Sequence, residues 1–136
     1  MRPKYRTSIV PRFSDFDLQG ILNSRQYLDL VGEARTDQMK RCYKVPLETF
    51  TNRGQTFVLR TFEIAYEKPI YYGTAFDIET WVDDVRGPMA EILFRFVSPG
   101  DDVIYANGSA RYFLVDCESR KPVEFSEEIR RVYLGD

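Results

Sequence analysis

Four successive segments in the second half of the chain place apolar side chains at every second position. This period is that of a strand with one buried face, and it predicts strands at 56–66, 75–86, 89–98 and 103–115. The expected buried faces consist of Val58, Phe62, Ile64 and Tyr66, interrupted by Arg60; of Phe76, Ile78, Thr80 and Val82; of Ala90, Ile92, Phe94 and Phe96; and of Ile104, Ala106, Gly108, Ala110, Tyr112 and Leu114. Such a chain folds around an antiparallel sheet.

Only one long segment, residues 25–42, has the period of an amphipathic helix. Its apolar stripe consists of Tyr27, Leu30, Val31 and Ala34. Asn23 or Ser24 is positioned to cap the first turn, and Pro46 follows the end. The helix therefore lies between a first strand, expected at 5–13, and the four later ones.

Three small residues, Ala106, Gly108 and Ala110, share one face of the last strand. Strand interiors favour bulky side chains, so small ones indicate that another element approaches closely, and the long helix is the candidate. The predicted fold class is α+β: an antiparallel meander of five strands with the helix against one face, in a single domain spanning residues 1–136. A short helix near 126–132 is expected to follow.

The opposite face of the predicted sheet carries Trp81, Leu93, Phe113 and Val115 among polar residues. One helix cannot cover both faces of five strands. A second copy of the chain is therefore expected, as a homodimer or homotetramer, since most oligomers are symmetric.

Histidine is absent from all 136 residues, which excludes a Ser-His-Asp triad, a Cys-His dyad and any His-ligated metal site within the chain. The 19 basic and 21 acidic residues give a net charge of −2, which argues against a nucleic-acid partner. No run approaches the ~18 apolar residues of a membrane span, and no apolar segment follows the basic N-terminus. We therefore expect a cytoplasmic protein without a membrane partner.

The segment between the first strand and the helix gathers groups that suit acyl transfer. Asp15 and Asp17 lie two residues apart, Gly20 follows, and the start of the helix comes next. A helix start offers free N–H groups and a positive dipole end, so a carboxylate beside it supplies a base or nucleophile next to an oxyanion site. The alternative is that Asp15 or Asp17 accepts hydrogen bonds from turn N–H groups, which is the commoner role of Asp in loops.

Residues 10–35 closely resemble the 4-hydroxybenzoyl-CoA thioesterase family of hotdog-fold proteins. The resemblance rests on Asp-x-Asp-x-x-Gly at 15–20, Asn23 at the helix opening, Tyr27, and Glu-Ala-Arg at 33–35. Similarity continues through Tyr66-Glu-Lys-Pro69 with Gly73, and through Val115-Asp116 with Arg120-Lys121-Pro122-Val123. It implies a hotdog fold, a curved antiparallel five-stranded sheet wrapped around one long central helix, and acyl-CoA thioesterase activity. Two departures, Ile21 where many members carry histidine and the large Gln19, bear on the pocket and the substrate.

Carried onto this chain, the resemblance assigns Asp17 as the catalytic carboxylate and the Ser24 backbone N–H as the donor that polarises the thioester carbonyl. Asp17 either attacks the carbonyl or activates a water as general base, and the sequence leaves both routes open. A thiolate is a good leaving group, so neither a metal nor a cofactor is required. Gly20 and Asn23 are expected to contact the substrate, and Tyr27 to form a wall of its pocket.

Other residues carry weaker expectations. Asp15 is expected to hold the loop, and Glu33 to form a salt bridge with Arg35 or a connector residue. The cationic candidates for the phosphates of coenzyme A are Arg60, Lys68, Arg86, Arg120 and Lys121, each of which is equally an ordinary surface charge. The aromatic candidates for the acyl pocket are Tyr27, Phe57, Phe62 and Tyr66, for which core packing is the alternative.

Two other functions fit the same residues. One is an acyl-carrier-protein thioesterase, which would need a basic docking face for its acidic carrier. The other is a catalytically silent hotdog module that binds an acyl ligand or serves in assembly. Asp17 separates an enzyme from a binding module.

Overall fold

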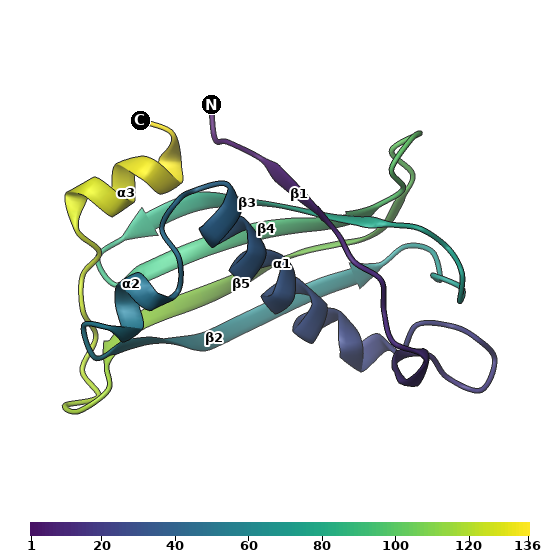
Figure 1. The fold of residues 1–136 in the computed structure, drawn as a ribbon, viewed down its shortest axis with the longest axis horizontal. Helices are drawn as coiled ribbons and strands as arrows, with labels where there is room; N and C mark the ends of the chain where they lie inside the picture. Colours follow the sequence, from purple (N-terminus) through teal and green to yellow (C-terminus); the bar gives the residue numbers. More distant parts are fainter.

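The computed structural model describes all residues from Met1 to Asp136. It contains a five-stranded antiparallel sheet in the order β1-β3-β4-β5-β2. The strands are β1 (Tyr5–Ser8), β2 (Gln55–Tyr66), β3 (Asp77–Arg86), β4 (Met89–Val97) and β5 (Ile104–Asp116), and the helices are α1 (Tyr27–Arg41), α2 (Glu48–Thr51) and α3 (Glu127–Leu134). Figure 1 shows α1 lying across one face of the curved sheet, with α3 at one end beside both termini. The predicted α+β fold class is confirmed, with α2 as an element that the sequence did not predict.

The order of the strands differs from a simple meander. Strands β3, β4 and β5 follow one another, but β2 pairs with β5 and forms the far edge. The free side of β3 is taken by β1, with Tyr5 opposite Thr80. Because β1 occupies that side, β2 cannot pair with β3, and the chain crosses over between these two strands. The expectation that β1 is an edge strand is confirmed, although β1 ends at Ser8, well before Pro11.

The buried face predicted for β2 is wrong in part, because the strand contains a β-bulge. The register with β5 shifts between Leu59 and Thr61, which inserts one extra residue and reverses the alternation. Phe57 therefore packs on the helix side together with Phe62. Val58 and Tyr66, both predicted to be buried, are 40% and 51% exposed.

The other predicted faces are confirmed. The three positions on β3, Phe76 directly before it, and the four positions on β4 are all buried, at no more than 3% exposure. On β5, Ala106, Ala110 and Leu114 are buried, and the other positions of that face are half-buried. The apolar stripe of α1 is buried against them, and Ser126 caps α3 by accepting a hydrogen bond from the Ile129 N–H at 3.2 Å. No helix of the structure combines the length and apolar composition that crossing a bilayer requires.

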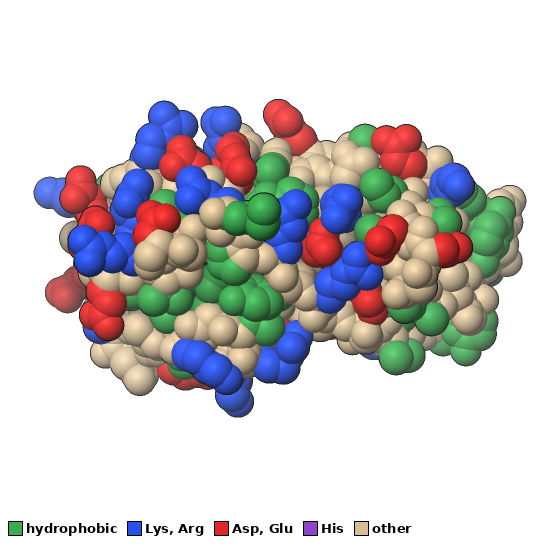
Figure 2. Space-filling view, turned by 90° about the horizontal axis from the view of Figure 1, so that it is seen from above, with side chains coloured by type: hydrophobic (Ala, Val, Ile, Leu, Met, Phe, Trp, Pro, Cys, Tyr) green, Lys and Arg blue, Asp and Glu red, His purple; other side chains and the backbone are tan.

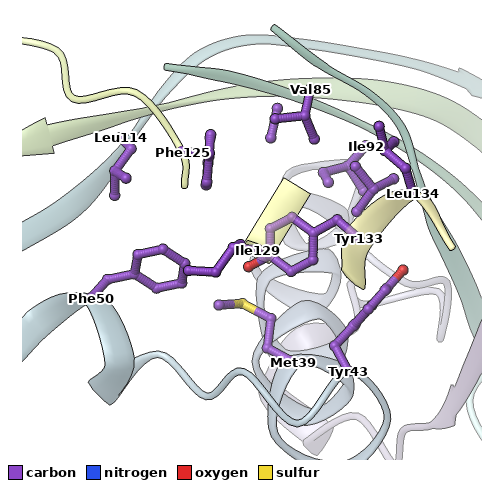
Figure 3. Close-up of a cluster of buried hydrophobic side chains, with 12 residues drawn as sticks. Met39, Tyr43, Phe50, Val85, Ile92, Leu114, Phe125, Ile129, Tyr133 and Leu134 are labelled. Atoms are coloured by element: carbon purple, nitrogen blue, oxygen red, sulfur yellow. The ribbon is translucent and has the colours of Figure 1, made fainter. Parts of the chain in front are cut away.

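The core divides into two clusters along α1. One lies under the first half of the helix and includes Tyr27, Val31, Phe94 and Phe96. The other lies under its second half, where Met39 of α1 meets Phe50, Ile129 and Tyr133 from α2 and α3 (Figure 3). The short helices α2 and α3 therefore close the end of the sheet that α1 alone leaves uncovered.

At Gly108 the close approach predicted from the small residues is made by an aromatic ring and a strand rather than by the helix. An added Cβ would lie 2.0 Å from the carbonyl oxygen of Glu63 on β2 and 2.7 Å from the ring of Phe94 on β4. The rings of Phe62 and Phe94 stack above this position with their centroids 5.3 Å apart. Because these rings fill the space, Gly108 has no room for a side chain.

We expect Gly108→Ala to lower the free energy of unfolding by about 3 kcal/mol, which is roughly 10 °C in Tm, because backbone or ring must move. The matched control is Gly32→Ala in α1, where an added Cβ has nothing within 4 Å. Removing a glycine from a helix interior should raise the unfolding free energy by about 0.5–1 kcal/mol. Thermal melting of the two variants checks the opposite signs, and equal shifts would contradict the packing described at Gly108.

A buried carboxylate ties β1, β3 and β4 together on the outer face of the sheet. Glu79 is only 7% exposed and accepts hydrogen bonds from Arg6 Nε at 3.2 Å and from Arg95 Nε at 3.0 Å. Burial alone would raise its pKa, but the bonds from Arg95 and Arg6 lower the pKa of Glu79 below its ordinary value. The folded state therefore binds fewer protons here than the unfolded state.

Stability from Glu79 should be complete above the unfolded pKa of about 4.3 and should be lost as the pH falls through the lower folded value. We expect Glu79→Gln to lower Tm at pH 7 and to reduce the further loss of Tm between pH 7 and pH 3. Glu127→Gln, which removes a carboxylate 63% exposed on α3, should leave both quantities nearly unchanged. Melting curves at the two pH values decide, and an unchanged acid loss in Glu79→Gln would refute this role.

Candidate active site

The loop before α1 is held in one conformation by backbone hydrogen bonds. Phe16 bridges to Leu22 across the loop, and Leu22 N–H donates to the Ile70 carbonyl at 2.8 Å. The Gly20 carbonyl accepts from the Tyr72 N–H at 2.8 Å. Gly20 has a φ of +77°, in the left-handed region where a glycine is needed for the turn. Gly20, which was predicted to contact the substrate, therefore has a structural role in the turn of this loop.

Asp17 lies exposed on the loop and has one carboxylate oxygen engaged by its own turn. Its Oδ1 accepts from the N–H groups of Gln19 and Ile21, each at 2.9 Å. The turn-capping role weighed for Asp17 therefore occurs in the structure. It uses only Oδ1, and Oδ2 makes no hydrogen bond within the chain, so one oxygen is oriented and available to an incoming molecule.

Asp15 is structural, as expected. It is 3% exposed, and its carboxylate accepts from the Arg12 N–H at 2.8 Å and from the Arg12 guanidinium at 3.1 Å. Burial alone would raise its pKa, but the bonds from Arg12 lower the pKa of Asp15. The Asp15 carbonyl also accepts from the Asn23 N–H at 2.9 Å, which brings the start of the helix beside the Asp15–Asp17 segment.

The helix starts with a 3-10 turn, Ser24–Gln26, before α1 itself. Asn23 stands at the position before this turn, but its side chain makes no capping hydrogen bond, and that of Ser24 makes none either, so the predicted cap by Asn23 or Ser24 is wrong. The Ser24 N–H has no acceptor within the chain, as is usual for the first N–H groups of a helix. A free donor at the positive end of the helix dipole therefore follows directly after the Asp17 loop.

Tyr66, at the end of β2, fixes this helix start from across the fold. Its hydroxyl donates to the Ser24 carbonyl at 2.8 Å, and its ring meets that of Tyr27 edge to face at 5.0 Å. The sequence suggested Tyr66 only as a pocket aromatic. Nothing in the sequence could have paired residues 42 positions apart, because the contact depends on β2 lying at the far edge of the sheet.

Tyr27 is a buried core residue rather than an acid or base. It is 3% exposed and packs against Phe96 with ring centroids 4.8 Å apart. Burial, and secondarily Tyr66, raises the pKa of Tyr27 to about 12, so the phenol keeps its proton at neutral pH. This agrees with the core-packing alternative, and a place for Tyr27 in the wall of the substrate pocket stays a prediction.

Arg60 lies away from the loop, on the outer face of the sheet. The bulge turns it there, and its guanidinium stacks 4.8 Å from the ring centroid of Phe113. It shares an open groove with Arg86 and Arg111. The structure therefore does not bring Arg60 together with Asp17 and Ser24 within one chain. On the face shown in Figure 2, acidic and basic side chains are interspersed, and hydrophobic side chains gather between them.

The expected salt bridge of Glu33, with Arg35 or with a connector residue, does not form. Residues two apart on a helix point in different directions, and here Glu33 is exposed while Arg35 is buried at 7% exposure. Glu33 instead borders an open groove of about 540 Å³ that runs from Gln26 along α1 to Leu59 of β2. This groove begins two residues from Ser24 and offers a path along the helix for a bound molecule.

Comparisons with known proteins bear on the family and the fold of the chain. A family model described as "Thioesterase-like superfamily" matches residues 11–132. A relative from Bacillus subtilis (strain 168), named "Putative acyl-CoA thioesterase YneP", is 24% identical over 120 residues, covering 88% of this chain and 86% of its own.

Solved structures share the same architecture. The DHNA-CoA thioesterase from Staphylococcus aureus matches with a TM-score of 0.86 at 16% identity, over 96% of this chain and 88% of that one. Slr0204, a 1,4-dihydroxy-2-naphthoyl-CoA thioesterase from Synechocystis, matches with a TM-score of 0.85 at 12% identity, over 96% of both chains. The hotdog fold expected from the sequence is thereby confirmed.

Proposed function

Because the chain belongs to the Thioesterase-like superfamily, we propose that it hydrolyses acyl-CoA thioesters to the free acid and coenzyme A. The observation that carries the proposal is that one hydrogen-bonded loop and the helix start that follows it present an oriented carboxylate and a free N–H. Asp17 has Oδ2 unengaged, and the Ser24 N–H has no acceptor. These are the two groups that attack on a thioester requires.

In this mechanism the thioester carbonyl oxygen accepts the Ser24 N–H, which stabilises the negative charge that develops there, assisted by the helix dipole. In the general-base route, Asp17 takes a proton from a water whose oxygen bonds to the carbonyl carbon. In the nucleophilic route, Asp17 Oδ2 bonds to that carbon and forms an anhydride that water then hydrolyses. In both routes the C–S bond breaks, and its electron pair leaves on sulfur as the thiolate.

The loop geometry gives a reason for each supporting residue. Gly20 allows the turn that presents Asp17, Asn23 lies between that turn and the donor, and Tyr66 anchors the first turn of the helix through the Ser24 carbonyl. We propose Gly20, Asn23 and Tyr27 as substrate contacts around the thioester. Arg60 would serve coenzyme A only where a second copy of the chain brings it near a neighbouring site.

We propose that the protein is a homo-oligomer, on the evidence of its far sheet edge. The 12-residue strand β2 pairs only with β5, so the backbone groups along its other side are unpaired. Long free edges are normally covered, and Val58 and Tyr66 add exposed apolar surface there, at 40% and 51%. Sedimentation equilibrium should give an even multiple of the 16.0 kDa chain mass, and a monomer at micromolar concentration would refute the pairing.

The substrate carrier separates this proposal from its nearest alternative, an acyl-carrier-protein thioesterase. The test compares kcat/KM for one acyl group on coenzyme A and on acyl carrier protein, at low and high salt. We expect the CoA thioester to be favoured and turnover of the carrier to be weak. Preference for the carrier, abolished by salt, would instead show docking to an acidic protein. Turnover of neither would favour the silent binding module.

A further inference from the structure

A second cavity lies at the other end of α1 from the Asp17 loop. It has a volume of about 170 Å³ and lies between the second half of the helix, the sheet and α3. Its apolar walls include Met39, Phe57, Ile92 and Tyr133, and it opens beside the exposed Thr36. A helix rises about 1.5 Å per residue, so Arg35 lies about 12 Å along α1 from Tyr27. Figure 1 shows the Asp17 loop and α3 at opposite ends of the molecule.

One wall of this cavity carries a buried charge without a counter-ion. Arg35 is 7% exposed and lines the cavity, and none of the ion pairs of the protein includes it. Its NH1 donates to Thr80 Oγ1 at 3.0 Å, and its guanidinium lies 5.2 Å from the ring centroid of Tyr43. A guanidinium has five N–H donors, so most of its hydrogen-bonding capacity is unused by the chain.

No other charge faces this cavity. The remaining lining residues are apolar or neutral, and burial raises the pKa of Tyr133 to about 12, so its phenol stays protonated. Buried charges in proteins are normally paired, and a guanidinium matches a carboxylate in a two-point geometry. A cavity that is apolar on all sides except for one cationic wall is complementary to an organic acid with a compact apolar body.

We propose that this cavity binds a small apolar carboxylic acid, with its carboxylate on Arg35 and its hydrocarbon body against Met39, Phe57 and Ile92. The size of the cavity sets the size of the ligand, because an engineered apolar cavity of about 150 Å³ accommodates benzene. The ligand class is therefore an aromatic or aliphatic acid of roughly six to eight carbons. The cavity adjoins the groove that begins near Ser24, since Gly32 and Tyr112 line both, but it includes neither Asp17 nor Ser24. Binding of an acid there does not depend on the proposed function.

The test is calorimetric titration of the unmodified protein with benzoate and hexanoate, each beside its neutral amide. We expect at least one acid to bind tenfold or more tightly than its amide. Arg35→Met, which keeps an unbranched apolar stem and removes the charged guanidinium, should abolish that preference. Lys40→Met removes an exposed charge from the same helix and should keep it, as should Asp17→Asn.

A second variant keeps the proposal testable if Arg35→Met does not fold. Ala90 lines the cavity at 3% exposure, and Ala90→Leu places its added carbons in the cavity, so acid and amide should both fail to bind. Equal binding of acid and amide to the unmodified protein, a preference that survives Arg35→Met, or undiminished binding to Ala90→Leu would each overturn the proposal. Comparison of benzoate with hexanoate distinguishes an aromatic from an aliphatic ligand.

Discussion

Asp17→Asn is expected to lower kcat for thioester hydrolysis by about 100- to 10,000-fold, the usual contribution of a catalytic acid or base. Asparagine keeps an oxygen at the position of Oδ1, so the hydrogen bonds from the Gln19 and Ile21 N–H groups are retained. It cannot take a proton from water or form an anhydride. The loss should therefore fall on kcat, with little change in KM or in Tm.

The control for this prediction separates the two roles of Asp17. Asp17→Ala removes the turn cap as well as the base, so it should lose activity to the same degree and also lower Tm. Thiol release and thermal melting of both variants measure these effects. Full activity in Asp17→Asn would show that the carboxylate only caps its turn and that hydrolysis uses another group as base or nucleophile.

Ser24→Pro should lower kcat by about 100- to 1,000-fold, because proline has no N–H and removes the donor proposed for the oxyanion. The site suits this substitution unusually well. The Ser24 N–H has no acceptor to lose, and Asn23, at φ −59° and ψ 133°, already has the extended backbone that a following proline demands. Proline is also favoured at the first position of a helix.

Ser24→Ala is the matched control, since it removes the hydroxyl and keeps the N–H. We expect it to stay within a few-fold of the unmodified protein in kcat, with both variants folding as judged by circular dichroism. If Ser24→Ala were as inactive as Ser24→Pro, the hydroxyl and not the backbone would be the important group. An active Ser24→Pro would remove the donor from the mechanism.

Sequence patterns predicted the elements whose signals are local. The residues of the apolar stripe of α1 and the alternating apolar residues of β3 and β4 are buried as predicted. Each of these elements presents a single uninterrupted face to the core. The alternation predicted for β2 breaks at Arg60, because a bulge inserts one residue into the strand there. The types of the residues in this segment do not reveal the bulge. The place of β2 at the far edge was also not predictable, because pairing with β5 depends on which edges the other strands leave free.

The candidate site was predictable to a similar extent. The loop and helix start could be read from the residues and their resemblance to a family, because Asp17 and Ser24 lie seven positions apart and belong to one local unit. The hydrogen bond from Tyr66 to Ser24 and the burial of Arg35 against Thr80 join distant segments, and no local pattern encodes them. The failed pairing of Glu33 with Arg35 has a simple reason, since residues two apart on a helix do not face each other.

The measurement that tests the central claim most directly is the time course of thiol release from aromatic, short-chain and long-chain acyl-CoAs by the unmodified protein. We predict that at least one class is hydrolysed in many turnovers per enzyme, at a kcat in the range of about 1–1,000 per second that enzymes typically reach. Release no faster than in buffer from every class, by protein that melts cooperatively, would contradict the assignment of the Asp17–Ser24 site as a thioester hydrolase.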